Sequence, residues 1–412
     1  MLGPPLHTLR KEAQRRGFQA EYTDRLLAVA STLQNSRVPT VFTLMHLARL
    51  SNVSWKYLRS VVERKIDDYR VFTIQKRSGG NRRICSPSST LRRVQTWIHR
   101  NILCAAGSLA KIHAASTAYA PGSSIRANAK VHTGAAWIIK IDIKDFFESI
   151  SERQAYYAFR SLAYPALLSF ELARLCTRIA PPRDDGAQRK RDLLWRWNND
   201  RAKTGNPYGL VQSVGHLPQG APTSAMLANL VFAALDVRIN AIAQKHGATY
   251  SRYADDIVLS LTSGCRVECA KIFRDVTSVI SHAGYRINRS KSRITPPGAR
   301  KIVTGLVTND VTPRLPREMK EDIMLSIYHI KKHGLLSHME RRKSSSPLGY
   351  LNHLIGRILF AQSIENKFGS CALNELRVAM APYRDLLDMA RMLNPKTSGS
   401  NDFTALYLLV FP

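Results

Sequence analysis

Two adjacent carboxylates in the middle of an otherwise apolar stretch constrain this chain more than any other feature. Residues 248–261 are typical of a strand, a short turn and a second strand, with Asp255 and Asp256 at the turn. Like charges this close repel, and burying them beside apolar residues is costly unless a cation neutralises them. Acids on the turn of a surface hairpin are the alternative, although the apolar residues on both sides argue against full exposure.

A third carboxylate, Asp142, ends another apolar run at residues 136–142. A strand ending there would place the carboxylate at a sheet edge, facing a cleft; an aspartate that caps the following helix also explains the position. Asp142 and Asp255 together are able to hold two Mg²⁺ ions, because Mg²⁺ prefers oxygen ligands and adds waters and substrate phosphates. Two such ions suit an in-line phosphoryl displacement.

The charge of the chain indicates the kind of partner. Its 61 basic and 30 acidic residues give a formal net charge of +31, which favours nucleic acid or an anionic membrane surface. The longest apolar run, residues 225–235, is about half of what a membrane helix needs, and no clear amphipathic segment supports membrane binding. We therefore expect nucleotidyl transfer on a nucleic acid, and no membrane partner.

The six cysteines show neither zinc-ligand spacing nor a disulfide framework. They are expected to be idle thiols of a protein in a reducing cytoplasm.

The order of elements predicts an α/β or α+β core with helical ends. Residues 42–62 read as helix, turn and helix, either a DNA-binding unit or, as loop length favours, two helices that pack on a neighbour. Residues 73–87 form a predicted hairpin around Gly-Gly-Asn. Residues 181–207 are a polar, basic insertion. Residues 217–224, LPQGAPTS, open a long helix, either as a ligand site at its N-terminus or as a plain entry turn.

Taken in order, Asp142 with Phe146-Phe147, then LPQGAPTS, then Tyr253-Ala254-Asp255-Asp256 resemble the palm motifs of reverse transcriptases. The hairpin at residues 73–87 resembles the fingers segment that grips the incoming triphosphate. Residues 284–291 resemble the palm motif after the catalytic hairpin, and residues 302–306 the primer-grip strand. The resemblance covers roughly residues 55–390.

Two shorter signatures resemble those of bacterial retron reverse transcriptases: the NAxxH motif at residues 128–132 and the VTG motif at residues 303–305. Asn128 and His132 would share one helix face, as a paired RNA-contacting or structural unit does. On spacing alone, the two are ordinary polar helix residues. The sequence departs from the pattern at TSAML, where relatives often carry Pro after Ser, at residues 181–207, and beyond about residue 390.

The resemblance implies an α+β right-hand polymerase with fingers, a palm whose antiparallel sheet packs on helices, and a helical thumb. The implied divisions are an N-terminal helical region at 1–66, fingers at 67–135, a palm at 136–312 that contains the 181–207 insertion, and a thumb with the C-terminal helical region at 313–412.

It also implies the active site. Asp142 and Asp255 would bind the two Mg²⁺ ions with help from the Ile143 carbonyl, and Asp256 would be a supporting acid. Lys291 would be a general acid for pyrophosphate departure; a solvated lysine is the equal alternative.

The resemblance assigns further residues to substrates. Phe147 would exclude a nucleotide 2′-hydroxyl, or serve as a core aromatic, or both. The remaining assignments are dNTP contact by Lys76, Arg82 and Gln219, and RNA contact by Asn128, His132, Val303, Thr304 and Gly305.

Retron enzymes begin synthesis at the 2′-hydroxyl of a guanosine in a structured noncoding RNA and copy part of that RNA, which gives branched RNA–DNA (msDNA). They commonly pair with an effector protein in antiphage defence, and the resemblance implies the same partners here. One rival is a group II intron-type maturase, disfavoured because only about 100 residues follow Gly305 and no CxxC pair exists. The other is a non-catalytic RNA-binding scaffold, against which the intact Asp142, Asp255 and Asp256 argue.

Overall fold

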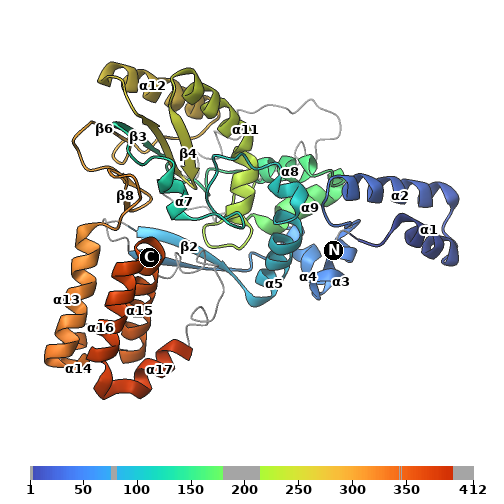
Figure 1. The fold of residues 1–412 in the computed structure, drawn as a ribbon. Coiled ribbons are helices and arrows are strands. Elements are labelled where there is room, and N and C mark those ends of the chain that lie inside the picture. The colour runs from blue at the N-terminus through green and yellow to red at the C-terminus, as the bar shows by residue number, and fades with distance from the viewer. Residues whose placement is uncertain (1–2, 76–80, 180–213, 343, 345, 393–412) are drawn as a thin grey trace.

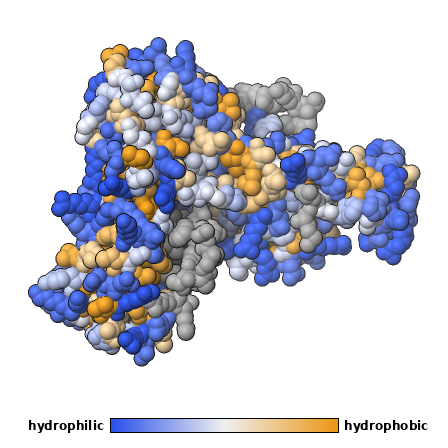
Figure 2. Space-filling model, viewed as in Figure 1, coloured by the Kyte–Doolittle hydropathy of each residue, from blue (hydrophilic) through white to orange (hydrophobic). Residues whose placement is uncertain are grey.

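The computed structural model describes residues 3–75, 81–179, 214–342, 344 and 346–392. Lys76 and the insertion at residues 181–207 therefore lie outside the described residues. The ribbon shows three parts: a pair of projecting N-terminal helices, a central mixed region that contains the main sheet, and a C-terminal helical lobe (Figure 1). Hydrophilic residues dominate the face shown in Figure 2 and largely cover the projecting helices.

The N-terminal region consists of helices. Their bounds are α1 Leu6–Arg15, α2 Ala20–Asn35, α3 Leu44–Ser51 and α4 Trp55–Val62. Thr43 caps α3 by accepting a hydrogen bond from the His46 amide, and Asn52 ends it in the left-handed conformation. Helix α4 buries Leu58 and packs against α9. The α3–α4 pair therefore packs on its neighbour, as loop length favours.

A hairpin follows, in which β1 (Tyr69–Gln75) pairs antiparallel with β2 (Asn81–Pro87). This confirms the predicted strand pair, whose connecting residues 76–80 are not described. The next helices are α5 Ser89–Trp97, the π-helical η1 Ile98–Leu103, α6 Ala106–Leu109 and α7 Ile125–Lys130.

The main sheet has four antiparallel strands in the order β4-β5-β3-β6. The strands are β3 Trp137–Asp142, β4 Thr249–Tyr253, β5 Asp256–Leu261 and β6 Arg293–Thr295. Strand β3 is central and buried, which agrees with its nearly continuous apolar sequence. The mixture of helices and an antiparallel sheet confirms the predicted α+β fold class.

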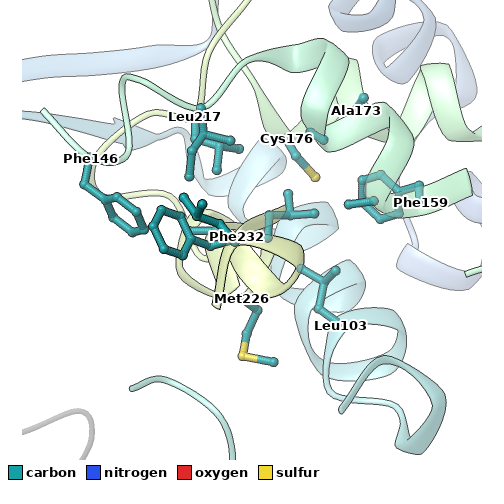
Figure 3. Packing of buried hydrophobic residues seen from close by; sticks show 14 of the residues in the cluster. Leu103, Phe146, Phe159, Ala173, Cys176, Leu217, Met226 and Phe232 are labelled. Atoms are coloured by element: carbon teal, nitrogen blue, oxygen red, sulfur yellow. The ribbon is translucent and has the colours of Figure 1, made fainter. Parts of the chain in front are cut away.

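The central core also receives side chains from α8 (Glu152–Ser161), α9 (Ala166–Cys176), α11 (Ser224–Lys245) and α12 (Arg266–His282). A capping box between Ser151 and Gln154 begins α8. Figure 3 shows how side chains far apart in the sequence meet there, with Phe146 and Phe232 edge to face and Phe159 near Cys176. All six cysteines are free thiols.

Helix α11 is long and apolar enough to cross a membrane, judged by length and composition alone. The prediction from residues 225–235 understated its apolar length. Half of its most apolar window is buried inside the protein, and the helix packs against α8, α12 and β4. Core helices of water-soluble proteins commonly meet the same criteria, so the finding is weak evidence for a membrane span.

The C-terminal lobe has its own apolar core, around Ile327, Leu354, Ile358 and Leu376. A small ladder of β7 (Ile302–Val303) and β8 (Leu306–Val307) leads into it. The elements of the lobe are α13 Arg317–His333, α14 Leu335–Arg341, α15 Pro347–Ile364, α16 Asn366–Ala379, η3 Ala381–Tyr383 and α17 Arg384–Met392. The four sequence divisions stay a prediction, since this second core also includes Ile125 and Ile138 from earlier in the chain.

Helix α12 provides a test of the central core. Ile272 is fully buried and Val267, on the same helix, is 76% exposed. We expect Ile272→Ala to lower the free energy of unfolding by about 2–5 kcal/mol, because it removes buried methyl groups and leaves a cavity. The matched control Val267→Ala should stay within about 0.5 kcal/mol of the parent protein. Urea unfolding followed by circular dichroism measures both, and equal losses would contradict the packing described.

Candidate active site

The central sheet brings Asp142 next to the turn between β4 and β5. Asp142 is the last residue of β3 and lies directly opposite Asp256, the first residue of β5. Tyr253 pairs with Asp256, so Ala254 and Asp255 form a two-residue turn. Ala254 has φ 57°, and the Ile143 amide donates a hydrogen bond to the Asp255 carbonyl at 3.1 Å. The predicted convergence of the three aspartates is therefore present.

Burial and mutual repulsion affect the ionisation of these carboxyls. Burial raises the pKa of Asp142 above its ordinary value, although Lys291 and a hydrogen bond from Asn288 oppose the shift. Burial, followed by the charges of Asp142 and Asp256, raises the pKa of Asp255 to about 6. Both shifts show that negative charge here is only partly compensated by the protein itself.

Two lysines approach the carboxylates. Lys291 Nζ lies 3.6 Å from Asp142 Oδ2, and its side chain is half exposed. Lys140, which the sequence analysis did not single out, places Nζ 2.7 Å from Asp256 Oδ2. The position of this lysine inside the apolar run of β3 is the sequence feature from which it could have been identified. Lys140 thus pairs with Asp256, and Lys291 pairs with Asp142.

The donor set fits a hard divalent cation. Within the described residues, no group of three or more His, Cys, Asp or Glu side chains is arranged to hold a metal by itself. Mg²⁺ usually takes one or two carboxylates and completes its shell with waters and substrate phosphates. Asp142 and Asp255 provide such a pair of oxygen ligands, and the buried Ile143 lies beside them.

The LPQG segment joins the β1–β2 hairpin to the core. The Gln219 carbonyl accepts a hydrogen bond from the Cys85 amide of β2 at 2.7 Å. Gly220 has φ 112°, and a Cβ there would lie 2.9 Å from Ile84 Cγ2, so this contact requires glycine. Arg82 is half-buried on the same strand. Nucleotide contacts by Gln219 and Arg82 stay predictions, as does that of Lys76.

Phe147 belongs to an aromatic group beside the catalytic turn. Its ring is half-buried and packs against Phe146 and Tyr119, with centroid distances of 5.5 and 6.3 Å. Tyr119 in turn contacts Tyr253, which precedes the turn. The ring therefore has core contacts while lying near the carboxylates, and both interpretations of Phe147 stay open.

The NAxxH and VTG residues form a buried hydrogen-bonded unit. His132 joins both strands of the catalytic hairpin, with its ring nitrogens 2.6 Å from Ser251 Oγ and 2.7 Å from Ser260 Oγ. Asn128 accepts from Thr117 at 2.7 Å and donates to Thr304 at 3.4 Å.

This burial bears on the assignment of these motifs to RNA, which stays a prediction. The side chains of Asn128, His132, Val303 and Thr304 are all buried, which argues against direct RNA contact through them and supports the structural alternative. Gly305 is exposed, and its RNA contact stays a prediction.

An antiparallel sheet with carboxylates at adjoining strand ends, flanked by helices and a basic hairpin, defines the palm of a nucleic acid polymerase. The family model described as reverse transcriptase (RNA-dependent DNA polymerase) matches residues 74–304.

Individual relatives narrow the class. The retron Ec86 reverse transcriptase of Escherichia coli is 30% identical over 84% of this chain and 96% of its own length. The retron Mx162 reverse transcriptase of Myxococcus xanthus is 32% identical over 64% of this chain and 53% of its own length. The retron Ec83 reverse transcriptase of Escherichia coli is 31% identical over 73% of this chain and 84% of its own length. The chain belongs to the retron reverse transcriptases, a family of RNA-directed DNA polymerases.

His132 makes the stability of the hairpin sensitive to acid. Burial lowers the pKa of His132 to about 4, so the folded protein keeps the ring neutral while the unfolded chain takes up a proton below about 6.5. The contribution of His132 to stability is therefore complete above pH 6.5 and falls by about 3 kcal/mol towards pH 4.

We expect His132→Gln to reduce the slope of the free energy of unfolding against pH, between pH 6.5 and 4, by up to the amount that one bound proton contributes. Urea unfolding at several pH values measures this slope. The matched control is His282→Gln, because that ring lies exposed on α12. An unchanged slope in His132→Gln would contradict the buried, neutral ring.

Proposed function

We propose that the chain copies part of a structured noncoding RNA into DNA with Mg²⁺ bound at Asp142 and Asp255. The observation that carries this proposal is the placement of Asp142 at the end of β3, opposite the Ala254–Asp255 turn. When bound there, two divalent ions activate the attacking hydroxyl and stabilise the leaving pyrophosphate. The raised pKa values of both carboxyls support the proposal, because burial, the larger cause of both shifts, disfavours the charged carboxylates that a bound cation would stabilise.

Residues of this chain then orient the substrates. Phe147 excludes the 2′-hydroxyl of an incoming nucleotide, which selects dNTPs, and Arg82 and Lys76 neutralise the triphosphate. Lys291 lies within reach of Asp142 and has an exposed side chain, so it is placed to give a proton to the departing pyrophosphate. The Gln219 segment fixes the hairpin that carries Arg82, through the Cys85 contact.

The C-terminal lobe is the proposed thumb that holds an RNA-containing duplex through phosphates, shape and 2′-hydroxyls. Some of its cations are already used inside the lobe. Arg342 and Arg357 both pair with Asp322, and Lys320 pairs with Glu365. Residues 313–412 nevertheless contain 14 basic and nine acidic residues, so an excess of 14 − 9 = 5 positive charges is available for phosphate binding.

Membership of the retron family supports the finer proposals. Synthesis would begin at the 2′-hydroxyl of a guanosine in the RNA, and the product would be msDNA. An effector protein would complete an antiphage defence system in the cytoplasm.

The polymerase site is tested by Asp255→Asn, which keeps the shape of the side chain and removes its charge. Purified protein is given an annealed primer on an RNA template, dNTPs and Mg²⁺. We expect the variant to lose at least about a thousandfold in rate, because one metal ligand is gone. The matched control Asp275→Asn, on the outer helix α12, should extend the primer at the parent rate. Comparable extension by Asp255→Asn and the parent protein would contradict the proposed site.

The priming proposal is tested on the nucleic acid that co-purifies with the parent protein. We expect a short single-stranded DNA attached to RNA through a 2′–5′ branch, detected by sequencing before and after treatment with a debranching enzyme. Protein carrying Asp255→Asn should contain the RNA without the DNA. DNA joined only through a 3′–5′ linkage would refute priming from the 2′-hydroxyl while leaving the polymerase assignment intact.

A further inference from the structure

A fully buried arginine lies three residues before the catalytic Asp255. All five N–H groups of Arg252 have hydrogen-bond acceptors. Nε and Nη2 each donate to one oxygen of Asp236 at 2.8 Å, and Nη2 also donates to Ser116 Oγ at 3.1 Å. Nη1 donates to Asn229 Oδ1 and to the Ala254 carbonyl, both at 3.2 Å. Every N–H group of the guanidinium thus donates to an acceptor in the protein.

The partner carboxylate comes from the middle of the apolar helix α11. Asp236 is fully buried and also accepts a hydrogen bond from Tyr250 at 2.6 Å. The Arg252 guanidinium lies 4.6 Å from the centroid of Phe232 on the same helix. A buried ion pair contributes little net stability compared with an apolar pair of the same volume, because both charges lose their hydration. Stability alone therefore does not account for the Arg252–Asp236 pair, which indicates a further role.

That role is indicated by the bond to Ala254. Ala254 holds φ 57°, a left-handed conformation that alanine adopts at a cost, and its carbonyl is fixed by Arg252. The next carbonyl, that of Asp255, accepts from the Ile143 amide of the adjoining strand. The turn is thus held on one side by Arg252 and on the other by Ile143.

We propose that Arg252 and Asp236 are positioning residues that hold the Ala254–Asp255 turn so that the Asp255 carboxylate faces Asp142. Asp236 neutralises the guanidinium, so the pair acts on Asp255 through the geometry of the backbone. This inference rests on the proposed metal-binding role of Asp255. Lysine cannot replace the forked guanidinium, because a single ammonium cannot serve both the carboxylate and the Ala254 carbonyl in the same geometry.

The test is Arg252→Lys, which keeps the positive charge and loses the fork. We expect kcat for incorporation of one nucleotide on an RNA template to fall on the order of a hundredfold, while KM for the dNTP changes less than about threefold. Binding of Mn²⁺ alone, followed through the EPR signal of the free ion, should weaken by about tenfold or more. The Mn²⁺ measurement does not depend on activity.

The matched control is Arg174→Lys, which disturbs another buried fork away from the hairpin. Arg174 donates to Glu152 at 3.1 Å and to the Val62 carbonyl at 2.8 Å. This variant should lower Tm like Arg252→Lys, yet keep the parent kcat per folded molecule and the parent Mn²⁺ affinity. If Arg252→Lys loses kcat only in proportion to its unfolded fraction and binds Mn²⁺ like the parent, the positioning role is overturned.

A milder variant covers the case in which Arg252→Lys does not fold. Tyr250→Phe removes only the hydroxyl that supports Asp236. It should show smaller decreases in the same two quantities, and parent values of both would refute the proposal. If Asp255→Asn itself binds Mn²⁺ like the parent protein, the proposed metal site fails instead, so the two failures are distinguishable.

Discussion

The repulsion between Asp142 and Asp255 is the constraint on which the rest of the site depends. The antiparallel register of β3 and β5 places Asp142 opposite Asp256, the residue that follows Asp255, at one end of a buried sheet. Burial first, and then the charges of Asp142 and Asp256, disfavour the ionised Asp255 carboxylate and raise its pKa to about 6. The proposed divalent cation would offset this penalty and at the same time bind the phosphates of a nucleotide.

The residues around the three carboxylates hold them in place and compensate their negative charge only in part. Lys140 pairs with Asp256, and the half-exposed Lys291 pairs with Asp142. Behind the turn, Arg252 is balanced by Asp236 and stabilises backbone geometry. His132 ties the two hairpin strands together from another side without adding a charge. Arg252 and His132 therefore hold the backbone of the hairpin, whereas the two lysines balance the charge of the carboxylates only in part.

Much of this arrangement could be predicted from the sequence, because local patterns carried it. Asp142 ends an apolar strand and Asp255 interrupts an apolar hairpin, so both were identified, together with the α+β fold and the hairpin at residues 73–87. Arg252 and Asp236 were missed because they are distant in the sequence and each looks like an isolated charge. Their signal was a single charged residue, Arg252, in a short strand and a single aspartate, Asp236, in an apolar helix. Asn128 and His132 were identified as important, but their burial depends on tertiary packing that spacing cannot reveal.

The most direct test of the account is a structure of the complex with an RNA template, a primer, a dNTP and Mg²⁺, using a primer that lacks the attacking hydroxyl. We predict Mg²⁺ at about 2.1 Å from carboxylate oxygens of both Asp142 and Asp255, with the triphosphate bound to the same ions. A metal ion bound without either of these carboxylates, or a triphosphate located away from the end of β3, would contradict it.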